Sequence, residues 1–178
     1  MKVLSLFLER VPSKFYVKQL ARELKIGPAS ASRSLKNLHK QGFLLKTKEG
    51  RENYYSLIKE KQLNKYFAVT YTLFWLEQFG LTGKLLEIDP HIVSVALFGS
   101  IAAGDYDENS DLDLLIISKK EKADFYPVIR ELEKEFKREV LPTIINPIEW
   151  IKMTKKNDRF CSEVEKRYIM LYGNRLET

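Results

Sequence analysis

The sequence is poor in the residues that build covalent or metal-based scaffolds. It has a single cysteine, Cys161, which excludes an intramolecular disulfide and a zinc site made of cysteines. Its two histidines, His39 and His91, are too few for a histidine-rich metal centre. With 44% apolar, 12% aromatic and 30% charged residues among 178, the chain is neither disordered nor collagen-like. This length suits one ordinary domain or two small ones.

Long apolar runs are also missing. The apolar run near the start of the chain holds only six residues before Glu9 and Arg10 interrupt it. A signal peptide needs a longer apolar core and a cleavage site, and a membrane-spanning helix needs about 20 apolar residues. We therefore expect a soluble, cytoplasmic protein with no membrane partner.

Charge is distributed unevenly along the chain. Residues 1–70 contain 15 Lys and Arg against 5 Asp and Glu, a formal charge of +10, whereas residues 71–178 contain 15 against 19, a charge of −4. The asymmetry indicates a basic module joined to a mildly acidic one, and the basic module is the candidate for a polyanionic partner. On charge alone, a solvated lysine-rich surface is an equal alternative.

The pattern of residues 1–58 predicts three helices followed by a β-hairpin. Apolar residues recur at helical spacing, Gly27-Pro28 forms a tight turn before the third helix, and Gly42 ends that helix. The predicted helices are Met1–Arg10, Tyr16–Leu24 and Pro28–Gln41, and the predicted strands are Leu44–Lys48 and Asn53–Leu57.

This order, with the stretch YVKQLARELKIGPASASRSLKNLHKQGFL, resembles the winged helix-turn-helix domains of prokaryotic transcription regulators. The resemblance implies that Pro28–Gln41 is a recognition helix for the major groove of double-stranded DNA and that the hairpin wing contacts the backbone. No acidic residue occurs between Lys25 and Lys48, which favours DNA over the alternative of purely protein contacts. The DNA-binding candidates are Ser30, Arg33, Lys36, Lys46, Lys48 and Arg51.

Residues 59–82 are predicted to connect two domains. Glu60–Phe79 lacks proline and glycine and is rich in aromatic residues, whose spacing of three and four predicts one stripe along a long helix. Such a stripe suits a homodimer interface on a two-fold DNA site, or packing onto the second module of the same chain. The aromatic residues are Tyr66, Phe67, Tyr71, Phe74, Trp75 and Phe79.

A second module, residues 83–178, contains two apolar runs separated by a glycine-serine pair and a pair of aspartates. Ile92–Phe98 predicts a buried strand that leads into Gly99-Ser100 and a polar loop of ten residues. Asp111 and Asp113 then begin another apolar strand and, being two residues apart, project to the same side. Two neighbouring carboxylates repel unless a cation lies between them, so we expect Mg²⁺ there. Gly99 lets a phosphate approach the backbone, and Ser100 supplies a hydroxyl donor.

The stretch LFGSIAAGDYDENSDLDLLII resembles the core motif of the DNA polymerase β-like nucleotidyltransferases, most closely their minimal members. The resemblance implies an α+β chain of two domains whose second domain is an α/β fold with a small mixed sheet. It also implies two metal ions held by three catalytic carboxylates. Asp111 and Asp113 match the first two. Glu139, before the predicted strand Val140–Ile145, is the candidate for the third, or else a solvated residue that closes a helix.

One position departs from this family. Where minimal members commonly have Ala-Arg-Gly, this chain has Ala102-Ala103-Gly104, so one phosphate contact is missing unless Lys119 and Lys120 replace it. The resemblance implies transfer of a nucleoside monophosphate from a nucleoside triphosphate such as ATP to an acceptor. A partner protein, an antibiotic and a nucleic-acid end all remain open as that acceptor. The alternative is a transcription regulator whose second domain binds nucleotide or protein without catalysis.

Overall fold

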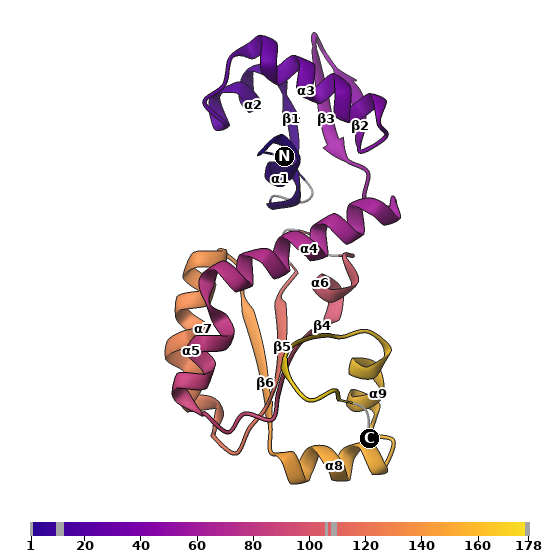
Figure 1. Ribbon diagram of the computed structural model, residues 1–178. Helices are drawn as coiled ribbons and strands as arrows, with labels where there is room; N and C mark the ends of the chain where they lie inside the picture. The colour runs from indigo at the N-terminus through magenta and orange to yellow at the C-terminus, as the bar shows by residue number, and fades with distance from the viewer. Residues whose placement is uncertain (1, 10–12, 106, 108–109, 177–178) are drawn as a thin grey trace. The chain divides into compact units, whose positions relative to one another are not determined.

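Figure 1 shows the computed structural model of the chain, which describes residues 2–9, 13–105, 107 and 110–176. The chain divides into two compact units, Met1–Tyr71 and Thr72–Thr178. The division falls within helix α4 (Gln62–Phe79), inside the segment predicted as a connector.

The first unit has the order of a winged helix-turn-helix domain, as the sequence predicted. Its elements are α1 (Lys2–Glu9), β1 (Lys14–Tyr16), α2 (Val17–Glu23), α3 (Pro28–Lys40), β2 (Leu44–Glu49) and β3 (Glu52–Leu57). The strands form an antiparallel sheet in the order β1-β3-β2. Strand β1 was not predicted, because three residues are too few to show an alternating pattern and only the pairing with β3 defines them.

Apolar faces of the three helices and the sheet meet in one core. Phe7 of α1 and Phe15 of β1 pack edge to face with their ring centroids 5.2 Å apart. Leu20 of α2 and Leu35 of α3 are fully buried in the same cluster. Burial of each such side chain contributes about 1.5–3 kcal/mol, so this core holds α3 firmly against the sheet.

Helix α4 does not carry the single aromatic stripe that was predicted. Its buried positions recur every four residues and are mostly small or polar: Asn64, Ala68, Thr72 and Leu76. The aromatic residues divide instead, since Tyr66 and Phe74 are 61% and 62% exposed. Trp75 packs against Phe79 and Phe136, at centroid distances of 5.9 and 4.7 Å. The spacing correctly predicted a helix, but residues three or four apart extend around more of its circumference than one stripe.

The second unit is built on a mixed four-stranded sheet, which confirms the predicted α+β class. After α4 its elements are α5 (Leu81–Ile88), β4 (Ser94–Phe98), α6 (Gly99–Ala103), β5 (Leu112–Ile117), α7 (Lys122–Phe136), β6 (Val140–Ile145), α8 (Pro147–Lys155), α9 (Arg159–Lys166) and β7 (Ile169–Gly173). The strand order is β6-β5-β4-β7, in which only β5 and β6 run parallel.

Strand β5 lies in the middle of this unit and is buried on both faces. Helices α5 and α7 pack together on one side of the sheet, while α8 and α9 lie on the other side with Trp150 and Val164 in a core that includes Leu115 and Ile117 (Figure 1). A strand packed on both faces is held rigidly, so the residues at its start have fixed positions.

The prediction of a ten-residue polar loop after Gly99-Ser100 is partly wrong. Residues 99–103 form the short helix α6, which buries Ile101 and Ala102 and ends at Gly104 in the left-handed conformation, with φ +70°. The apolar pair lies within a short, otherwise polar segment, which is why the sequence pattern did not reveal a helix.

Candidate active site and DNA-binding surface

Gly99 lies directly against Asp113 in the candidate active site. Phe98 and Asp113 are paired across β4 and β5, which places Gly99 directly against the aspartate. A Cβ atom added at Gly99 would lie 2.0 Å from Oδ2 and 2.8 Å from Cγ of Asp113. Gly99 also has φ +71°, a conformation that other residues rarely adopt. Glycine is therefore required here for two reasons: the backbone conformation and the closeness of the Asp113 carboxylate. The predicted approach of a phosphate to Gly99 stays a prediction.

Asp111 and Asp113 lie at the start of β5 and are both half-buried. The intervening Leu112 is fully buried on the opposite face, in agreement with the predicted projection of the two aspartates to one side. Burial raises the pKa of Asp113, and the negative charge of Asp111 raises it further. The folded chain therefore holds two carboxylates in an arrangement that opposes their joint ionisation.

The register of the parallel pair β5 and β6 determines which residue of β6 neighbours each aspartate. Asp113 is paired with Leu141, which is 41% exposed. Glu139 is the residue before β6, and its backbone carbonyl accepts a hydrogen bond of 2.9 Å from the amide of Leu112. Glu139 is exposed to solvent. In the register of the two strands Leu112 is paired with Val140, so Glu139 lies opposite Asp111 and Leu141 lies opposite Asp113. The neighbour of Asp113 on β6 is thus apolar.

The donor set fits a hard divalent cation, though with two carboxylates rather than three. Carboxylate oxygens are ligands that Mg²⁺ prefers, and a cation between Asp111 and Asp113 would relieve their repulsion. Across the residues that the structure describes, no group of three or more His, Cys, Asp or Glu is arranged to hold a metal ion. Glu139 therefore stays a prediction for the third position.

The other predicted nucleotide contacts lie on α6 and at the far end of β5. Ser100 is half-buried at the start of α6, beside Gly99, and its carbonyl accepts the amide of Asp105 at 3.0 Å. Ala103, where the resemblance predicts an arginine, ends the same helix. Lys119 and Lys120 follow the opposite end of β5, which lies about 13 Å along the strand from Asp113. They do not substitute for that arginine.

Sequence reasoning missed a cation at this site, Arg138. Its Nη1 donates a hydrogen bond to the carbonyl of Ser110 at 3.0 Å and another to the carbonyl of Asp107. Ser110 precedes Asp111, so Arg138 fixes the chain that enters the site. The sequence places Arg138 next to the candidate Glu139, just before β6, and this nearness could have indicated a role at the site. Only the parallel pairing of β5 and β6 brings Arg138 beside Ser110.

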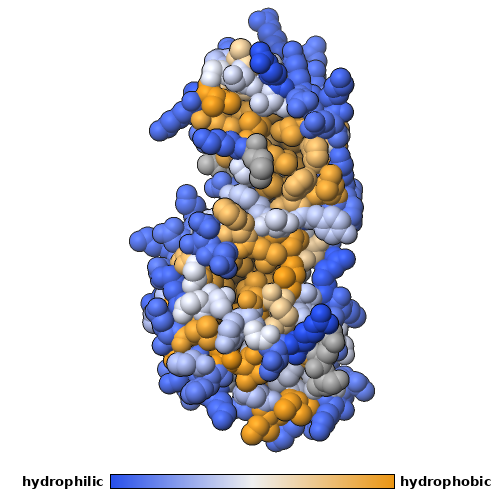
Figure 2. Space-filling model, in the orientation of Figure 1, coloured by the Kyte–Doolittle hydropathy of each residue, from blue (hydrophilic) through white to orange (hydrophobic). Residues whose placement is uncertain are grey.

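The six predicted DNA-binding residues all lie on exposed parts of the first unit. Ser30, Arg33 and Lys36 are exposed on α3, whose opposite face buries Ala31 and Leu35 in the core. The remaining three are exposed on the wing: Lys46 and Lys48 on β2, and Arg51 in its turn. Hydrophilic side chains dominate the end of the first unit that carries α3 and the wing (Figure 2).

Comparison with known families follows this division into two units. The profile described as "Nucleotidyltransferase domain" matches residues 81–170, half of the chain and the whole of the Gly99–Asp113 site. The chain belongs to this nucleotidyltransferase family. The profile described as "Bacterial regulatory protein, arsR family" matches residues 1–46, which include the helix-turn-helix. The chain thus joins a helix-turn-helix DNA-binding domain to a polymerase β-like nucleotidyltransferase domain.

Two solved structures resemble the chain loosely. A crystal structure of a toxin–antitoxin with AMP-PNP has 19% identity, a TM-score of 0.41, and covers 55% of this chain and 74% of its own. A mutant of the toxin–antitoxin MntA-HpeT has 17% identity, a TM-score of 0.38, and covers 54% and 72%. At such values the similarity does not extend to substrates or partners. No curated protein is a significant match. Within the described residues, no helix is long and apolar enough to span a membrane.

Proposed function

We propose that this chain binds double-stranded DNA through its winged helix and uses Mg²⁺ to transfer a nucleoside monophosphate from a nucleoside triphosphate to an acceptor. The observation that carries the proposal is the contact of Gly99 with Asp113, at the start of a strand that also positions Asp111. Because Gly99 has no side chain, the carboxylate of Asp113 lies directly against the backbone at the start of α6, so ligands for a divalent cation stand beside backbone that can bind a phosphate.

The chain's own residues would divide the work of the transfer. Ser100 and the backbone at Gly99 bind the phosphates, while Asp111 and Asp113 are the ligands for Mg²⁺. An oxygen of the acceptor attacks the α-phosphorus, the bond to the β-phosphate breaks, and pyrophosphate leaves; the acceptor's proton passes to Glu139. Bound Mg²⁺ would supply neutralisation of the charge on the transferring group. Following the minimal members of the family, we propose a hydroxyl of a partner protein as the acceptor.

The test is transfer of α-labelled ATP to protein or nucleic acid, measured with and without Mg²⁺. We expect label transfer by the wild type and none by Asp111→Asn with Asp113→Asn. In the same samples, ATP should raise the melting temperature only with Mg²⁺ and only in the wild type. Labelling that persists in the double variant would contradict the proposed site.

DNA binding has a separate test. Affinity for a duplex should fall steeply with salt, because each Lys or Arg that contacts a phosphate releases counter-ions. Arg33→Ala with Lys48→Ala should remove most of the affinity, since one residue lies on α3 and the other on the wing. Affinity that is indifferent to salt and to both substitutions would contradict the DNA-binding role.

A second candidate function is a regulator that binds nucleotide without transferring it. Leu141 favours it, because a leucine stands beside Asp113 where an acidic side chain would activate a hydroxyl acceptor. Measuring the rate of pyrophosphate release from Mg·ATP, with water as the acceptor, distinguishes the regulator from the enzyme. If the native site lacks a base, Leu141→Asp should raise the rate at least 10-fold above wild type and Leu141→Asn should not. Wild-type transfer that Leu141→Asp does not increase would support the enzyme.

We also propose that the chain forms a homodimer through α4. Leu63, Tyr66, Phe67 and Phe74 are exposed, and their spacing puts them on one face of the helix. A two-fold dimer would present two recognition helices to a two-fold DNA site. Light scattering should give twice the chain mass for the wild type and the monomer mass for Tyr66→Ser with Phe74→Ser.

A further inference from the structure

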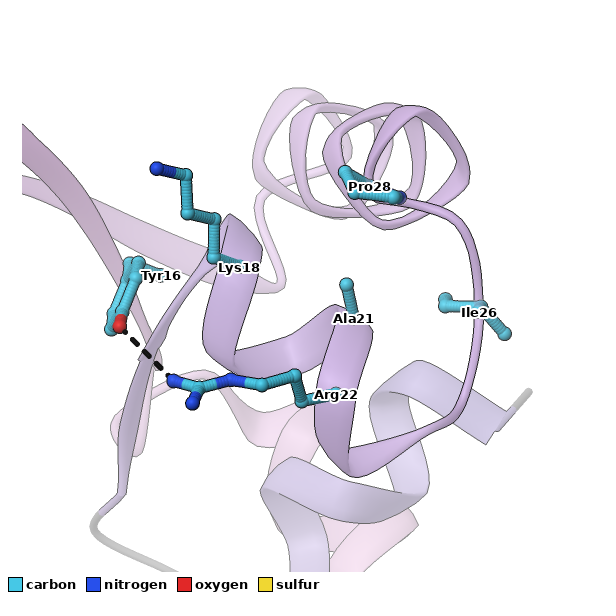
Figure 3. A pocket seen from close by; sticks show the side chains of 6 residues that line it. All are labelled: Tyr16, Lys18, Ala21, Arg22, Ile26 and Pro28. Carbon is cyan, nitrogen blue, oxygen red and sulfur yellow. Dashed lines mark hydrogen bonds between the residues drawn. The ribbon is translucent and has the colours of Figure 1, made fainter.

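The first unit has a hollow of about 510 Å³ that none of the functions above uses. It lies between α2 and the beginning of α3 and is lined by Tyr16, Lys18, Ala21, Arg22, Ile26 and Pro28 (Figure 3). Its surface combines two kinds of groups. Ala21, Ile26 and Pro28 form an apolar side. On the polar side the hydroxyl of Tyr16 lies beside the guanidinium of Arg22, and the side chain of Lys18 extends away from that pair.

The local chain geometry keeps this hollow open. Lys25 adopts a left-handed conformation at φ 52°, and the amide of Ile26 bonds back to the carbonyl of Ala21 at 3.0 Å. The chain therefore turns sharply after α2, and α3 begins at Pro28 with the two helices diverging. The turn is set by the backbone, so the apolar side of the hollow does not depend on the rotamer of a long side chain.

Arg22 is held at the polar side of the hollow. Its guanidinium donates a hydrogen bond of 3.4 Å to the hydroxyl of Tyr16, which lies at the end of β1 (Figure 3). The ring of Tyr16 is in turn fixed by an edge contact with Tyr54, at a centroid distance of 5.5 Å. A guanidinium has five N–H donors, so this bond leaves most of them available for a ligand.

The charge of the hollow points to an anion. In the part of the chain that the structure describes, neither Lys18 nor Arg22 forms an ion pair with a carboxylate. An adjoining hollow shares Tyr16 and Arg22 but is lined also by Gln19 and Glu23, whose carboxylate disfavours an anion. The two cations and the hydroxyl fit a phosphate ester, and the apolar side fits the sugar carbons attached to it.

We propose that this hollow seats one backbone phosphate of bound DNA, with the neighbouring deoxyribose against Ile26 and Pro28. The inference rests on the proposed DNA-binding function and adds a contact outside α3 and the wing. The position of the hollow supports this contact as well as its charge. Pro28 is the first residue of α3, and Ser30 and Arg33, the candidates for base or phosphate contacts, follow on the same helix. A phosphate held here would fix the depth at which α3 enters the groove.

The experiment measures binding of a fluorescent duplex of mixed sequence as a function of salt. Lys18→Gln with Arg22→Gln should weaken binding about 10-fold near physiological salt and lower the slope of log K against log salt by about 1. The matched control, Lys122→Gln with Lys134→Gln on α7, removes the same charge from the nucleotidyltransferase domain and should leave the slope unchanged. Tyr16→Phe should weaken binding less, because it removes only the hydroxyl beside Arg22.

The outcomes separate this inference from the function on which it rests. A wild type that binds no duplex contradicts the DNA-binding function itself. A wild type that binds while the Lys18 and Arg22 variant keeps its slope and affinity overturns only the phosphate contact in the hollow. ATP is the second source of a phosphate ester. If ATP without Mg²⁺ weakens DNA binding in the wild type and not in the variant, the hollow binds free nucleotide and the assignment to DNA is overturned.

Discussion

The α-carbon of Gly99 lies against the carboxylate of Asp113 so closely that no side chain fits between them. Gly99→Ala would place a methyl group 2.0 Å from Oδ2 and would strain a backbone at φ +71°. We expect a loss of at least about 1 kcal/mol in stability from the backbone conformation alone. Displacement of the Asp113 carboxylate should also abolish Mg²⁺-dependent stabilisation by ATP. Thermal unfolding with and without Mg·ATP measures both effects.

Gly83→Ala provides the matched control for that substitution. Gly83 lies within α5, and a Cβ atom there would meet nothing within 4 Å. Because alanine stabilises a helix more than glycine does, this variant should be unchanged in stability or more stable by up to about 1 kcal/mol. Equal behaviour of the two variants would contradict the steric role of Gly99.

Asp113→Asn should stabilise the chain at neutral pH when no Mg²⁺ is present. Burial and then Asp111 raise the pKa of Asp113 in the fold, so the folded state binds a proton more readily than the unfolded state. Its ionisation therefore lowers stability as pH rises from the ordinary carboxyl pKa through the raised value. Solvent screens the half-buried group, so we expect a gain of only about 1–3 °C in melting temperature.

The gain from Asp113→Asn should vanish in acid, where Asp113 is protonated in both states. It should reverse with Mg²⁺ and ATP, because the variant loses a ligand for the cation. Unfolding temperatures measured across pH, with and without Mg·ATP, test the sign. A variant that is less stable than wild type at neutral pH without Mg²⁺ would show that the carboxylate is held by interactions outweighing its repulsion.

Asp89 should show the opposite dependence on pH. This residue is 5% exposed; its Oδ2 accepts a 2.5 Å hydrogen bond from Ser118, and its Oδ1 accepts the amide of His91 at 2.9 Å. Burial alone would raise the pKa of Asp89, but these hydrogen bonds outweigh it and lower the pKa. Its contribution is present above the ordinary carboxyl pKa and is lost as pH falls through the folded value.

Asp89→Asn should therefore cost about 1–3 kcal/mol at neutral pH and progressively less in acid. Ser118→Ala removes the hydroxyl donor and should give a loss of the same sign. Urea unfolding at several pH values measures both. If the loss from Asp89→Asn did not shrink on acidification, the hydrogen-bonded carboxylate would not be its cause.

Lys61 should stabilise the end of helix α3. Its ammonium donates to the carbonyls of Gln41 at 3.1 Å and Gly42 at 2.9 Å and lies 4.2 Å from the ring centroid of Phe43. A cation at the end of a helix pairs with carbonyls that have no partner within the helix. Lys61→Met keeps the apolar stem and should cost about 1 kcal/mol, a fall of about 2–4 °C in melting temperature.

Lys59→Met is the control for Lys61, since it removes the same charge two residues earlier. It should leave the melting temperature unchanged within about 1 °C. A matching decrease in both variants would mean that the effect comes from net charge rather than from the contacts with Gln41 and Gly42.

Local patterns identified most of the elements before any tertiary contact was considered. Pro147 and the capping residue Asn146 set the start of α8, and both are signals that can be read from neighbouring residues alone. Asp111 and Asp113 were also found from spacing, because the alternation of a strand is a property of its own backbone. The strand β1 and the helix α6 were beyond such patterns, since three or five residues do not contain enough repeats of a strand or helix period to show one.

The sequence by itself determined the two modules, the glycine-serine pair, the two aspartates and the basic face of α3, because each depends on residues close together in the chain. The neighbours of these residues in space depend on the tertiary structure. Parallel pairing of β5 and β6 put Leu141 next to Asp113 and Arg138 next to Ser110, more than twenty residues away in each case. Strand register, which depends on burial over the whole sheet, fixes such neighbours, and no local spacing reports it.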